Sequence, residues 1–581
     1  MTKNLTTYLP IEDLSKEREY VYFGAVNGKI QNFLKYSKFN FSYGFTSNTK
    51  KERIDALKYC DSFTDKIIQS LTKNLNMIHG TQYSEKIWKV IFGRWLKDFI
   101  YICYFNFNHL EKLNNDYNFE KIFSLKYLDK EFVSSNSNSL VCLYLTPEWN
   151  SKLSTKILEF IGKKNRIRYI SDKDLTKNIV IKKQKNNNKI FKIIKNIFLI
   201  FNNFFNKHKN FFFFQSGLGF LFEKKIELKL NQIPSYWQFP TLKNEKYRFD
   251  EKMRKKIICE LSVDNNFEKF LTKNIHLFLP IYIIEEFKNI NQQIDSMTLP
   301  KNIKLIITGV GFVNEYFNIF AAKKMLQKSK YINLQHGNSY HTHYANDFVF
   351  ENSELDHMIT WGPMLKQQHK PLFNTNVLNQ ENILNKNGQN LTIICNQLTT
   401  RPLPYDLFLN KERNFLKTIE FTNSLDDNIK KKTSFRLFPA NVNDFNNNLK
   451  KMLEANNLNF YKDHLTYKEV ISNTKICLFN YESTGFYENL ILNIPSIYYC
   501  TDNFIDLKED VIADYELLVD AKIIFKDKLK LIKHLNEIWN NPSMWWDNPK
   551  TKEKINNFNS KYNRPPNKAI ERFANCLKNL I

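Results

Sequence analysis

A histidine lies where an apolar run ends in the middle of this chain. The run Tyr331–Leu334 is typical of a buried strand, and Gln335-His336-Gly337 follows it directly. The next six residues, Asn338 to His343, are polar and include two more histidines. Because parallel α/β sheets bind ligands beyond the carboxyl ends of their strands, this position predicts that His336 belongs to a binding site. An imidazole can act near neutral pH as a base, an acid or a phosphate partner.

A second polar group follows an apolar run closer to the carboxyl terminus. The sequence predicts a helix from Gly485 to Leu492, stopped by Pro495. Ser483 and Thr484 then lie at its amino end, where free N–H groups and the helix dipole attract phosphate. Glu488, one turn further on, is placed to accept hydrogen bonds from a ribose. Simple capping also explains the serine and threonine, and it is the favoured interpretation for those two residues alone.

Two more charged residues come shortly after predicted strands. Glu315 follows the strand Ile303–Ile307 and its loop, and is a second candidate base. An acidic residue in a first helical turn ordinarily compensates the dipole, which is the favoured interpretation here. Arg401 follows the strand Leu391–Cys395, and its paired donors suit a phosphate or diphosphate. Arg436 lies inside a predicted strand, where it could instead form a structural ion pair.

Metal binding is not expected. Four histidines have no accompanying cysteine pair or fixed carboxylate spacing: His336, His341, His343 and His357. The eight cysteines are scattered without a CxxC pair, so neither a zinc site nor a disulfide framework is indicated. This cysteine usage fits a reducing, cytoplasmic setting.

The elements that must position these residues alternate between strand and helix from about residue 300. A strand at 303–307, a helix at 314–328 and the strand ending at Gln335 form one βαβ unit, which implies a parallel sheet. Gly309-Val310-Gly311 lacks the third glycine of a dinucleotide fingerprint. Residues 366–390 are predicted to be a linker. A second alternating region then follows, with strands predicted at 391–395, 435–438, 475–479 and 496–499.

The amino-terminal part is predicted to be mainly helical. Helical spacing is present in Lys86–Phe92 and Trp95–Ile100, whereas Ser139–Leu145 is predicted to be a strand that stops before Pro147. Ile190–Phe198 has the spacing of an amphipathic basic helix. It suits either an anionic bilayer or a surface helix that leads into a buried strand at Phe211–Phe214.

At 581 residues the chain exceeds one ordinary core, so two or more domains are expected. Two α/β regions joined by a linker predict a cleft between facing sheet edges. We expect an α/β domain with a helical elaboration at 1–375 and a second, Rossmann-like α/β domain at 388–545. A helical tail at 546–581 is expected to pack back across the domains.

The net charge of +26 suits an anionic partner. A membrane surface, nucleic acid and a phosphorylated substrate all fit, but the chain contains neither a zinc-finger nor an RNA-recognition pattern. A solvated surface with weak attraction to membranes is therefore favoured over nucleic-acid binding. The sequence predicts neither a signal peptide nor a transmembrane helix. We expect a cytoplasmic protein that can associate peripherally with the inner face of the cytoplasmic membrane.

Besides Gln335-His336-Gly337, the chain contains the motifs Tyr83-Ser84-Glu85-Lys86-Ile87-Trp88 with Gly93-Arg94-Trp95-Leu96, Asp356-His357-Met358-Ile359-Thr360-Trp361-Gly362, and Ser483-Thr484-Gly485-Phe486 with Asn493-Ile494-Pro495-Ser496-Ile497. With these motifs, most of the chain resembles an uncharacterised family of transferases encoded in O-antigen and other surface-polysaccharide gene clusters. The last block is similar to the donor-site pattern of many two-domain sugar transferases. The resemblance implies a GT-B arrangement, in which two Rossmann-like domains face each other across a nucleotide-sugar cleft. It makes 1–375 the acceptor-side domain and 388–545 the nucleotide-sugar-binding domain.

The resemblance also implies an activity. It indicates a glycosyltransferase of lipopolysaccharide or O-antigen biosynthesis that acts on a glycan or lipid-linked glycan and needs no metal or cofactor beyond its donor. A similar QHG histidine occurs in capsule transferases that use CMP-activated keto-sugars, and another in polyol-phosphate transferases. His336 and Glu315 are then the candidate bases, and Gln335, Gly337, Arg401, Ser483, Thr484 and Glu488 the candidate donor-binding residues. His336 could instead hold the donor phosphate.

Two alternatives to the glycosyltransferase remain open. One is an enzyme that moves a polyol phosphate from a CDP-linked donor. The other is a non-catalytic basic module that binds membrane or nucleic acid through charge, and whose binding would weaken as salt rises.

Overall fold

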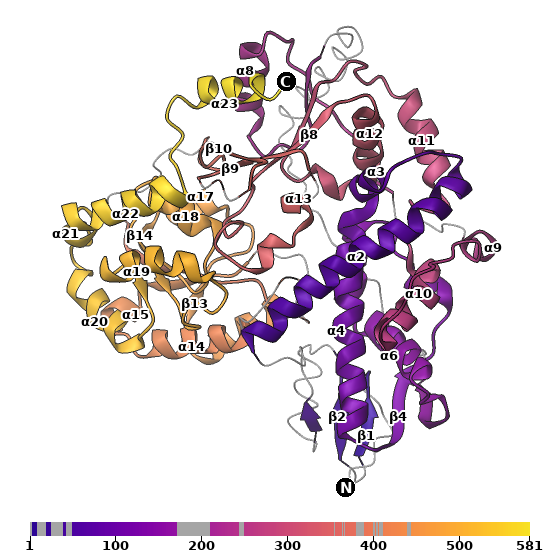
Figure 1. The fold of residues 1–581 in the computed structure, drawn as a ribbon. Coiled ribbons are helices and arrows are strands. Elements are labelled where there is room, and N and C mark those ends of the chain that lie inside the picture. Colours follow the sequence, from indigo (N-terminus) through magenta and orange to yellow (C-terminus); the bar gives the residue numbers. More distant parts are fainter. Residues whose placement is uncertain are drawn as a thin grey trace.

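The fold is α/β and is built on parallel sheets. A computed structural model describes residues 3–8, 19–24, 39–41, 49–170, 209–242, 249–353, 355–362, 364, 366–378, 388–398, 401, 405, 411–438 and 443–581. Within these residues, three sheets form, two of five strands and one of six. Figure 1 shows the amino-terminal sheet at the bottom, the carboxyl-terminal sheet at the left and the central sheet at the top. The predicted α/β class is confirmed. The predicted helix at 190–198 lies outside the described residues.

The amino-terminal sheet was not predicted, because its strands are short and far apart in the sequence. Its order is β3-β2-β1-β4-β5, and all of its strand pairs are parallel. The strands are β1 (Lys3–Thr6), β2 (Tyr20–Tyr22), β3 (Phe39–Phe41), β4 (Phe119–Leu125) and β5 (Ile167–Ile170). The amino-terminal part therefore combines a sheet with the expected helices.

Long helices connect this sheet to the rest of the molecule. They are α2 (Lys50–His79), α3 (Glu85–Trp88), α4 (Arg94–Asp116), α5 (Ser137–Tyr144) and α6 (Pro147–Phe160). A capping box of Thr49 and Glu52 begins α2, and Gly80 ends it in the left-handed conformation with φ 68°. A π-helical segment, Lys89–Gly93, joins α3 to α4. Figure 1 shows α2 crossing in front of α4.

The predicted strand Ser139–Leu145 is wrong, because these residues lie mostly in α5. Asn136 caps this helix by accepting a hydrogen bond from the Ser139 backbone N–H at 3.0 Å. Pro147 does not stop a strand but begins α6, where its missing N–H costs nothing. A short apolar run cannot be assigned to strand or helix by periodicity alone.

The central sheet contains the predicted βαβ unit. Its order is β10-β9-β8-β7-β6, again parallel throughout. The strands are β6 (Phe211–Phe213), β7 (Leu305–Thr308), β8 (Lys330–Leu334), β9 (His357–Thr360) and β10 (His369–Pro371). Helix α12 (Glu315–Leu326) joins β7 to β8, so this prediction is confirmed. The segment predicted as a linker contains β10, a three-residue edge strand too short to show a pattern.

Further helices surround the central sheet. They are α8 (Phe220–Lys229), α9 (Glu251–Arg254), α10 (Asn266–Phe278), α11 (Phe287–Ser296) and α13 (Phe350–Ser353). One face of the sheet shares a continuous hydrophobic core with the amino-terminal helices, as the buried side chains of Trp88, Ile306 and Tyr331 show. The other face packs under α8 and the carboxyl-terminal helix α23 (Ala569–Lys578).

The carboxyl-terminal sheet has the strand order of a doubly wound dinucleotide-binding fold. In sequence order its strands are β11 (Asn390–Ile394), β12 (Thr433–Arg436), β13 (Asn459–Phe460), β14 (Thr474–Phe479), β15 (Ser496–Tyr499) and β16 (Ile524–Phe525). In space they run β13-β12-β11-β14-β15-β16, which is the order 3-2-1-4-5-6. The four strands predicted in this region are confirmed. The direction of winding reverses between β11 and β14, and ligands of such sheets bind at this point.

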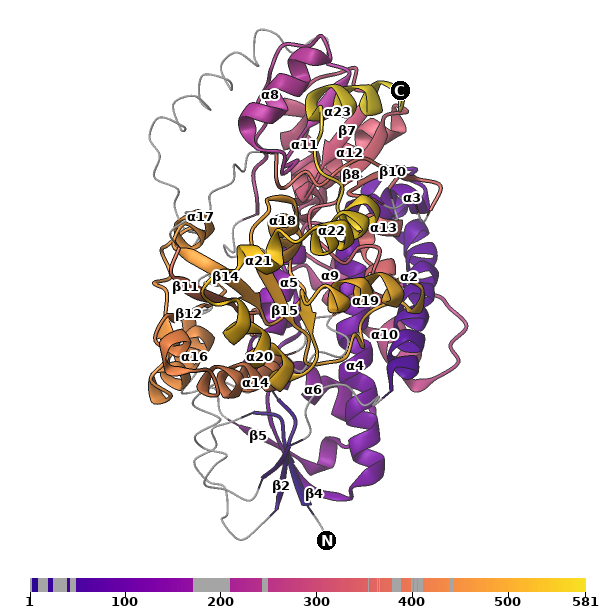
Figure 2. The ribbon, with the colours of Figure 1, turned by 90° about the vertical axis from the view of Figure 1, so that its left-hand side faces the viewer.

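Helices flank the carboxyl-terminal sheet and then return to the central sheet. They are α14 (Lys411–Asn423), α15 (Asp427–Lys430), α16 (Asn443–Ala455), α17 (Tyr467–Ile471), α18 (Thr484–Ile491), α19 (Ile512–Asp520), α20 (Lys528–Ile538), α21 (Ser543–Trp546) and α22 (Pro549–Tyr562). Helix α22 packs against α18 and α19, whereas α23 packs against α8. Figure 2 shows this path from α22 up to α23. A Cβ at Gly362 would collide with the Lys561 carbonyl, so Gly362 permits the crossing chain to approach.

Candidate functional site

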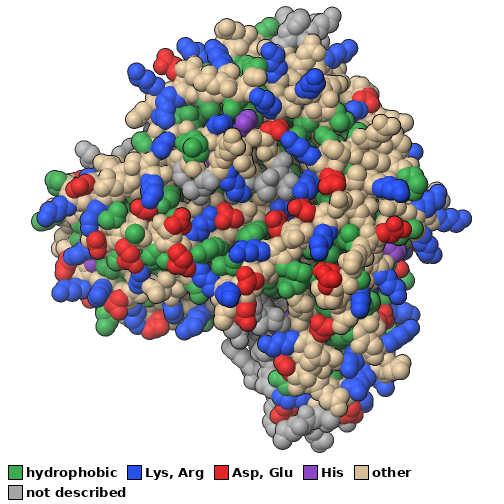
Figure 3. Space-filling model, viewed as in Figure 1, with side chains coloured by type: hydrophobic (Ala, Val, Ile, Leu, Met, Phe, Trp, Pro, Cys, Tyr) green, Lys and Arg blue, Asp and Glu red, His purple; other side chains and the backbone are tan. Residues whose placement is uncertain are grey.

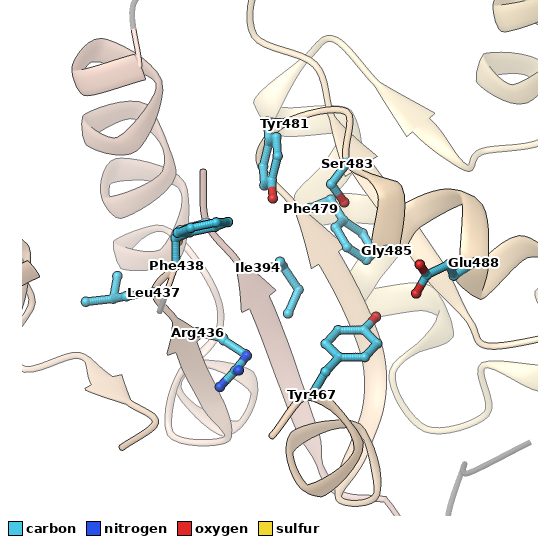
Figure 4. A pocket seen from close by; sticks show the side chains of 11 residues that line it. Ile394, Arg436, Leu437, Phe438, Tyr467, Phe479, Tyr481, Ser483, Gly485 and Glu488 are labelled. Atoms are coloured by element: carbon cyan, nitrogen blue, oxygen red, sulfur yellow. The ribbon is translucent and has the colours of Figure 1, made fainter. Parts of the chain in front are cut away.

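A pocket of 330 Å³ opens where the winding of the carboxyl-terminal sheet reverses. Its walls come from the ends of three neighbouring strands and from the start of α18. The lining residues are Ile394, Cys395, Arg436, Leu437, Phe438, Tyr467, Phe479, Tyr481, Ser483, Gly485 and Glu488. Figure 4 shows the aromatic rings of Phe438, Tyr481 and Tyr467 around the opening, with Ser483 and Glu488 on the side of α18. The pocket has the size of a small-molecule site and lies where the strand order predicts one.

The start of α18 forms one wall of this pocket as the sequence predicts. Ser483 is the N-cap, and its Oγ accepts a hydrogen bond from the Phe486 N–H at 3.1 Å. The favoured capping interpretation of Ser483 is therefore what the structure has. Thr484 begins the helix, and Glu488 lies one turn later among the pocket residues.

Arg436, at the end of β12, also lines the pocket. Burial lowers the pKa of its guanidinium, and Tyr467, Asp463 and Glu469 partly offset that effect. A structural ion pair was the role considered for Arg436 from the sequence, and the structure places its side chain beside a cavity. This position gives the pocket a cationic group on the wall opposite α18 (Figure 4).

The histidine loop of the central sheet contacts the start of α18. The Asn338 N–H donates to Thr484 Oγ1 at 3.3 Å, and Thr484 Oγ1 donates to Asn338 Oδ1 at 3.2 Å. A Cβ at Gly337 would lie 3.5 Å from Thr484 Oγ1, which shows how close the two backbones are. The cleft predicted between facing sheet edges would have Ser483, Thr484 and Glu488 opposite His336. The structure brings the loop that carries His336 against the first turn of α18.

Gln335 holds the beginning of this loop in place. Its side-chain oxygen accepts from the Trp361 N–H at 2.9 Å, and its backbone oxygen accepts from Trp361 Nε1 at 3.0 Å. Its side-chain amide donates to the Gly337 carbonyl at 2.9 Å. Gln335 is 4% exposed, so these bonds satisfy both the donor and the acceptor of a buried amide. Its assignment to the donor site stays a prediction.

His336 belongs to a chain of polar side chains that leads into the protein. The Tyr340 hydroxyl lies 3.0 Å from Nδ1 and 3.2 Å from Nε2 of His336. The same hydroxyl donates to Glu351 Oε1 at 2.9 Å. Arg94 in turn pairs with Glu351 at 3.4 Å and with Asp98 at 3.1 Å. These four groups come from the β8 loop, α13 and α4, and together they form what we call the histidine relay: His336, Tyr340, Glu351 and Arg94.

The surroundings of the histidine relay favour a neutral imidazole. Burial lowers the pKa of His336; the Glu351 carboxylate and the Gly309 backbone carbonyl partly oppose this, and Arg94 reinforces it. Burial and the neighbouring Glu351 also hold the pKa of Tyr340 well above its usual value. The tyrosine therefore keeps its proton. A neutral imidazole with an unshared pair can accept a proton, which an imidazolium cannot.

A second network joins the same loop to the carboxyl-terminal sheet. His343 Nε2 lies 2.8 Å from Glu482 Oε2, and Glu482 Oε1 accepts from the hydroxyls of Tyr487 and Tyr515 at 2.7 Å each. Asn338 Nδ2 donates to the Glu482 backbone oxygen at 3.2 Å. The loop thus has two attachments, with the histidine relay on one side and Glu482 on the other.

The two members of the ion pair have opposite pKa changes. Burial lowers the pKa of His343, but the Glu482 carboxylate outweighs this effect and the pKa is raised overall. Burial acts on Glu482 in the opposite sense, and the contacts with His343, Tyr515 and Tyr487 outweigh it and lower the pKa. Both groups are therefore charged over a wider pH range than either would be alone.

Glu315 lies in the first turn of α12 and is 2% exposed. Its carboxylate accepts hydrogen bonds from the Leu242 backbone N–H and from Asn136 Nδ2, the latter at 3.2 Å. Burial raises its pKa, and these hydrogen bonds oppose that change. The contacts tie α12 to the amino-terminal helices and agree with the favoured structural interpretation. A role as base stays a prediction.

Arg401 points into the amino-terminal region. Its Nη1 donates to Asn106 Oδ1 at 2.9 Å and to Asn150 Oδ1 at 2.6 Å. The guanidinium also stands 5.3 Å from the ring of Phe23 and 5.7 Å from that of Tyr144. These contacts attach the chain after β11 to α4, α5 and α6. A role in phosphate binding stays a prediction.

Several residues of the candidate site were not predicted from the sequence. Arg94 belongs to a motif that was noticed, but its partner Glu351 is 257 residues away. Tyr340 lies inside the polar stretch after His336, where nothing distinguished it from its neighbours. Glu482 directly precedes the predicted serine and threonine. The sequence feature that could have pointed to these residues is the high density of polar side chains directly after β8 and β14.

Two negative findings concern the described part of the chain. In the residues whose structure is described, no three or more His, Cys, Asp or Glu side chains are grouped so that they could hold a metal ion. Among the helices of those same residues, none is both long enough and apolar enough to cross a membrane.

The fold is that of an α/β protein with a pocket at the reversal point of a doubly wound sheet. The sequence model of the LIC12162 family transferase matches residues 13–577. The chain belongs to this family and is accordingly a transferase. A comparison with curated proteins finds no match to the chain.

Proposed function

We propose that this transferase moves a sugar from a nucleotide-activated donor to a surface polysaccharide or O-antigen acceptor, as a GT-B-like enzyme. The observation that carries the proposal is the contact between the His336 loop and the first turn of α18, at the edge of the pocket. We take His336, which precedes Asn338 in this loop, as the proton acceptor, and the pocket as the nucleotide site. The acceptor class, the peripheral membrane contact and a CMP-linked keto-sugar as donor come from the family resemblance described above.

The nucleotide is assigned to the pocket of the carboxyl-terminal sheet. The rings of Tyr481 and Phe438 offer surfaces on which a base can stack. Glu488 is in position to accept hydrogen bonds from ribose hydroxyls, and backbone N–H groups at the start of α18 can receive the phosphate. In this arrangement the activated sugar extends from the phosphate toward the loop at Gly337.

The reaction needs one proton transfer and one exchange of carbon–oxygen bonds. The acceptor hydroxyl attacks the anomeric carbon and gives its proton to His336. The bond between that carbon and the phosphate oxygen breaks, and the electron pair leaves with the nucleotide. N–H donors at a helix start stabilise the negative charge that develops on the leaving phosphate. The lowered pKa of His336 favours this basic role over binding phosphate as an imidazolium.

The charged surface is compatible with an anionic membrane as a neighbour. Figure 3 shows lysine and arginine side chains across the visible face, interspersed with acidic ones. With a net charge of +26, such a surface attracts anionic lipids weakly and at many points.

Calorimetric titration with CMP, UDP, GDP and dTDP tests the proposal. We expect one of them to bind with a Kd in the micromolar to millimolar range that is usual for substrates. Gly485→Leu should abolish this binding, because the new side chain enters the pocket. Gly485→Ala is the matched control, since its Cβ would meet no atom closer than 3.4 Å.

Two outcomes would count against the proposal. Binding of none of the four nucleotides would overturn the nucleotide-sugar assignment. A product whose mass shows added phosphorus would replace sugar transfer by transfer of a polyol phosphate.

A further inference from the structure

Arg436 is a pocket residue that the nucleotide contacts described above do not use. We propose that Arg436 binds the edge of the nucleobase and is a specificity-determining residue, which selects a base with two adjacent hydrogen-bond acceptors over one without them. Cytosine and guanine are such bases, whereas uracil and adenine are not. The inference rests on the proposed function, because it takes the pocket as the nucleotide site.

The guanidinium of Arg436 is available to a ligand. Arg436 is the last residue of β12, and its half-buried side chain lines the pocket. Within the part of the chain that the structure describes, no hydrogen bond or ion pair engages this guanidinium, although the charges of Asp463 and Glu469 act on its pKa. A guanidinium has five N–H donors and no acceptor, and its planar fork suits two parallel hydrogen bonds. A ligand in the pocket can supply the missing acceptors.

The place of Arg436 in the sheet favours a contact with the base over one with the phosphate. The phosphate is assigned to the start of α18, which follows β14, and β11 lies between β12 and β14. Neighbouring strands are about 4.8 Å apart, so the ends of β12 and β14 are separated by about 10 Å. A nucleotide spans a similar distance from its phosphate to the far edge of its base. Figure 4 shows Arg436 and Ser483 on opposite sides of Ile394.

The pocket between these two ends has an apolar floor. Ile394 and Phe479, at the ends of β11 and β14, form it. The ring of Phe438, on which the base is proposed to stack, follows Arg436 by two residues and lies on the same side of the pocket (Figure 4). Arg436 therefore offers charged donors to the edge of a base that rests on this ring.

The donors of a guanidinium distinguish bases by the acceptors that they present. Cytosine has the adjacent acceptors N3 and O2, and guanine has O6 and N7, so either base can form two parallel bonds with Arg436. In uracil a ring N–H separates the two carbonyl oxygens, and in adenine N1 and N7 each adjoin the amino donor. These two bases can accept only one bond and leave other donors of a half-buried guanidinium unsatisfied. Arg436 therefore disfavours uracil and adenine.

Calorimetric titration of the full-length protein with CMP, GMP, UMP and AMP tests the inference. The four nucleotides share one ribose and one phosphate, so differences in Kd report on the base. We expect CMP or GMP to bind at least about tenfold more tightly than UMP and AMP, and the tighter of the two identifies the base. Arg436→Met has no donor. It should weaken binding of the preferred nucleotide by about tenfold and change the affinity for UMP by no more than about twofold.

Two further variants make the test specific. Arg436→Lys keeps the charge but lacks the planar fork, so it should also lose most of the preference, and it decides the question if Arg436→Met fails to fold. Lys475→Met is the matched control for charge. Lys475 lies near the start of β14, at the opposite edge of the same parallel sheet, where its Nζ donates to the Trp539 carbonyl at 3.2 Å. This variant should leave all four affinities within about twofold of the wild type.

The outcomes separate the inference from the proposed function. If the wild type binds all four nucleotides equally, or prefers UMP or AMP, base selection by Arg436 is wrong and the nucleotide pocket stands. The same holds if Arg436→Met weakens all four to the same extent, which would assign the guanidinium to the phosphate. If the wild type binds none of them, the proposed function is wrong and the inference falls with it.

Discussion

The edges of the central and carboxyl-terminal sheets meet, yet they are built differently. The edge of the central sheet is filled: His336, Tyr340, Glu351 and Arg94 satisfy one another in a buried relay. The edge of the carboxyl-terminal sheet is open, with a 330 Å³ pocket between aromatic walls. Under the proposed function, the edge of the central sheet supplies the base and the edge of the carboxyl-terminal sheet binds the nucleotide. Substitutions at the two edges should then have separate effects on the rate of transfer and on nucleotide affinity.

The largest expected effect comes from the filled edge. His336→Gln should lower the rate of transfer by about a hundredfold to ten-thousandfold, the usual contribution of a general base. Because the pocket is untouched, the nucleotide affinity should stay within a factor of two or so of the wild type. Transfer assays and calorimetry on the same preparation check this. A variant that loses affinity as much as rate would remove the proposed separation.

The next largest effect concerns the ion pair of His343 and Glu482, which joins the loop after β8 to the carboxyl-terminal sheet. His343→Gln should destabilise the protein by about 2 kcal/mol, less than for a fully buried pair because His343 is partly exposed. Folding raises the pKa of His343. Its contribution to the free energy of unfolding is therefore complete below the pKa of the unfolded chain, and it is lost as pH rises through the pKa of the folded protein. Folding lowers the pKa of Glu482. Its contribution to the free energy of unfolding is therefore present above the pKa of the unfolded chain, and it is lost as pH falls through the pKa of the folded protein.

The ion pair of His343 and Glu482 should therefore stabilise the fold most between pH 4.5 and pH 6.5, the ordinary pKa values of the two side chains. Urea unfolding of wild type and His343→Gln at several pH values measures the difference in the free energy of unfolding. The difference should shrink above this range. A difference that stays constant up to pH 9 would show that packing, and not charge, explains the contribution of His343.

A smaller effect is expected from the open edge. Glu488→Gln should weaken nucleotide binding by about tenfold, since a charged acceptor for ribose hydroxyls becomes a neutral one. The rate at saturating donor should change little. Glu537→Gln serves as a control, because Glu537 lies on α20 and is not among the pocket residues. Equal effects of the two variants would argue for a general influence of charge instead of a ribose contact.

The smallest effect should come from Ser483. Its Oγ caps α18, and Ser483→Ala should cost about 1 kcal/mol of stability, the usual value for an N-cap. If Ser483 only caps the helix, nucleotide binding measured by calorimetry should remain. A loss of binding beyond a few-fold would show that this hydroxyl also contacts the phosphate.

The sequence predicts the open edge better than the filled one, for a physical reason. Strands β11, β14 and β15 contain short apolar runs, β12 leads into the apolar pair Leu437-Phe438, and α18 has a local start signal in Ser483. Such patterns depend only on residues that are close together in the sequence. The pocket that they form could therefore be anticipated from strand ends.

The histidine relay depends on contacts that no local pattern records. Arg94 and Glu351 are 257 residues apart in the sequence, and Glu351 lies on a four-residue helix without a periodic signal. The amino-terminal sheet was missed for a similar reason, because β1 pairs with β4 more than a hundred residues later. Ser139–Leu145 was assigned to a strand because capping by Asn136 competes with an apolar run that suits both structures.

The central claim, that the two edges divide binding from chemistry, is tested most directly by following two quantities in two variants. These are the affinity for the tightest-binding nucleotide and the rate at which that nucleotide is released from its sugar donor in the presence of acceptor. We predict that Gly485→Leu loses affinity, whereas His336→Gln keeps its affinity and loses nucleotide release. Release at the wild-type rate by His336→Gln would contradict the account.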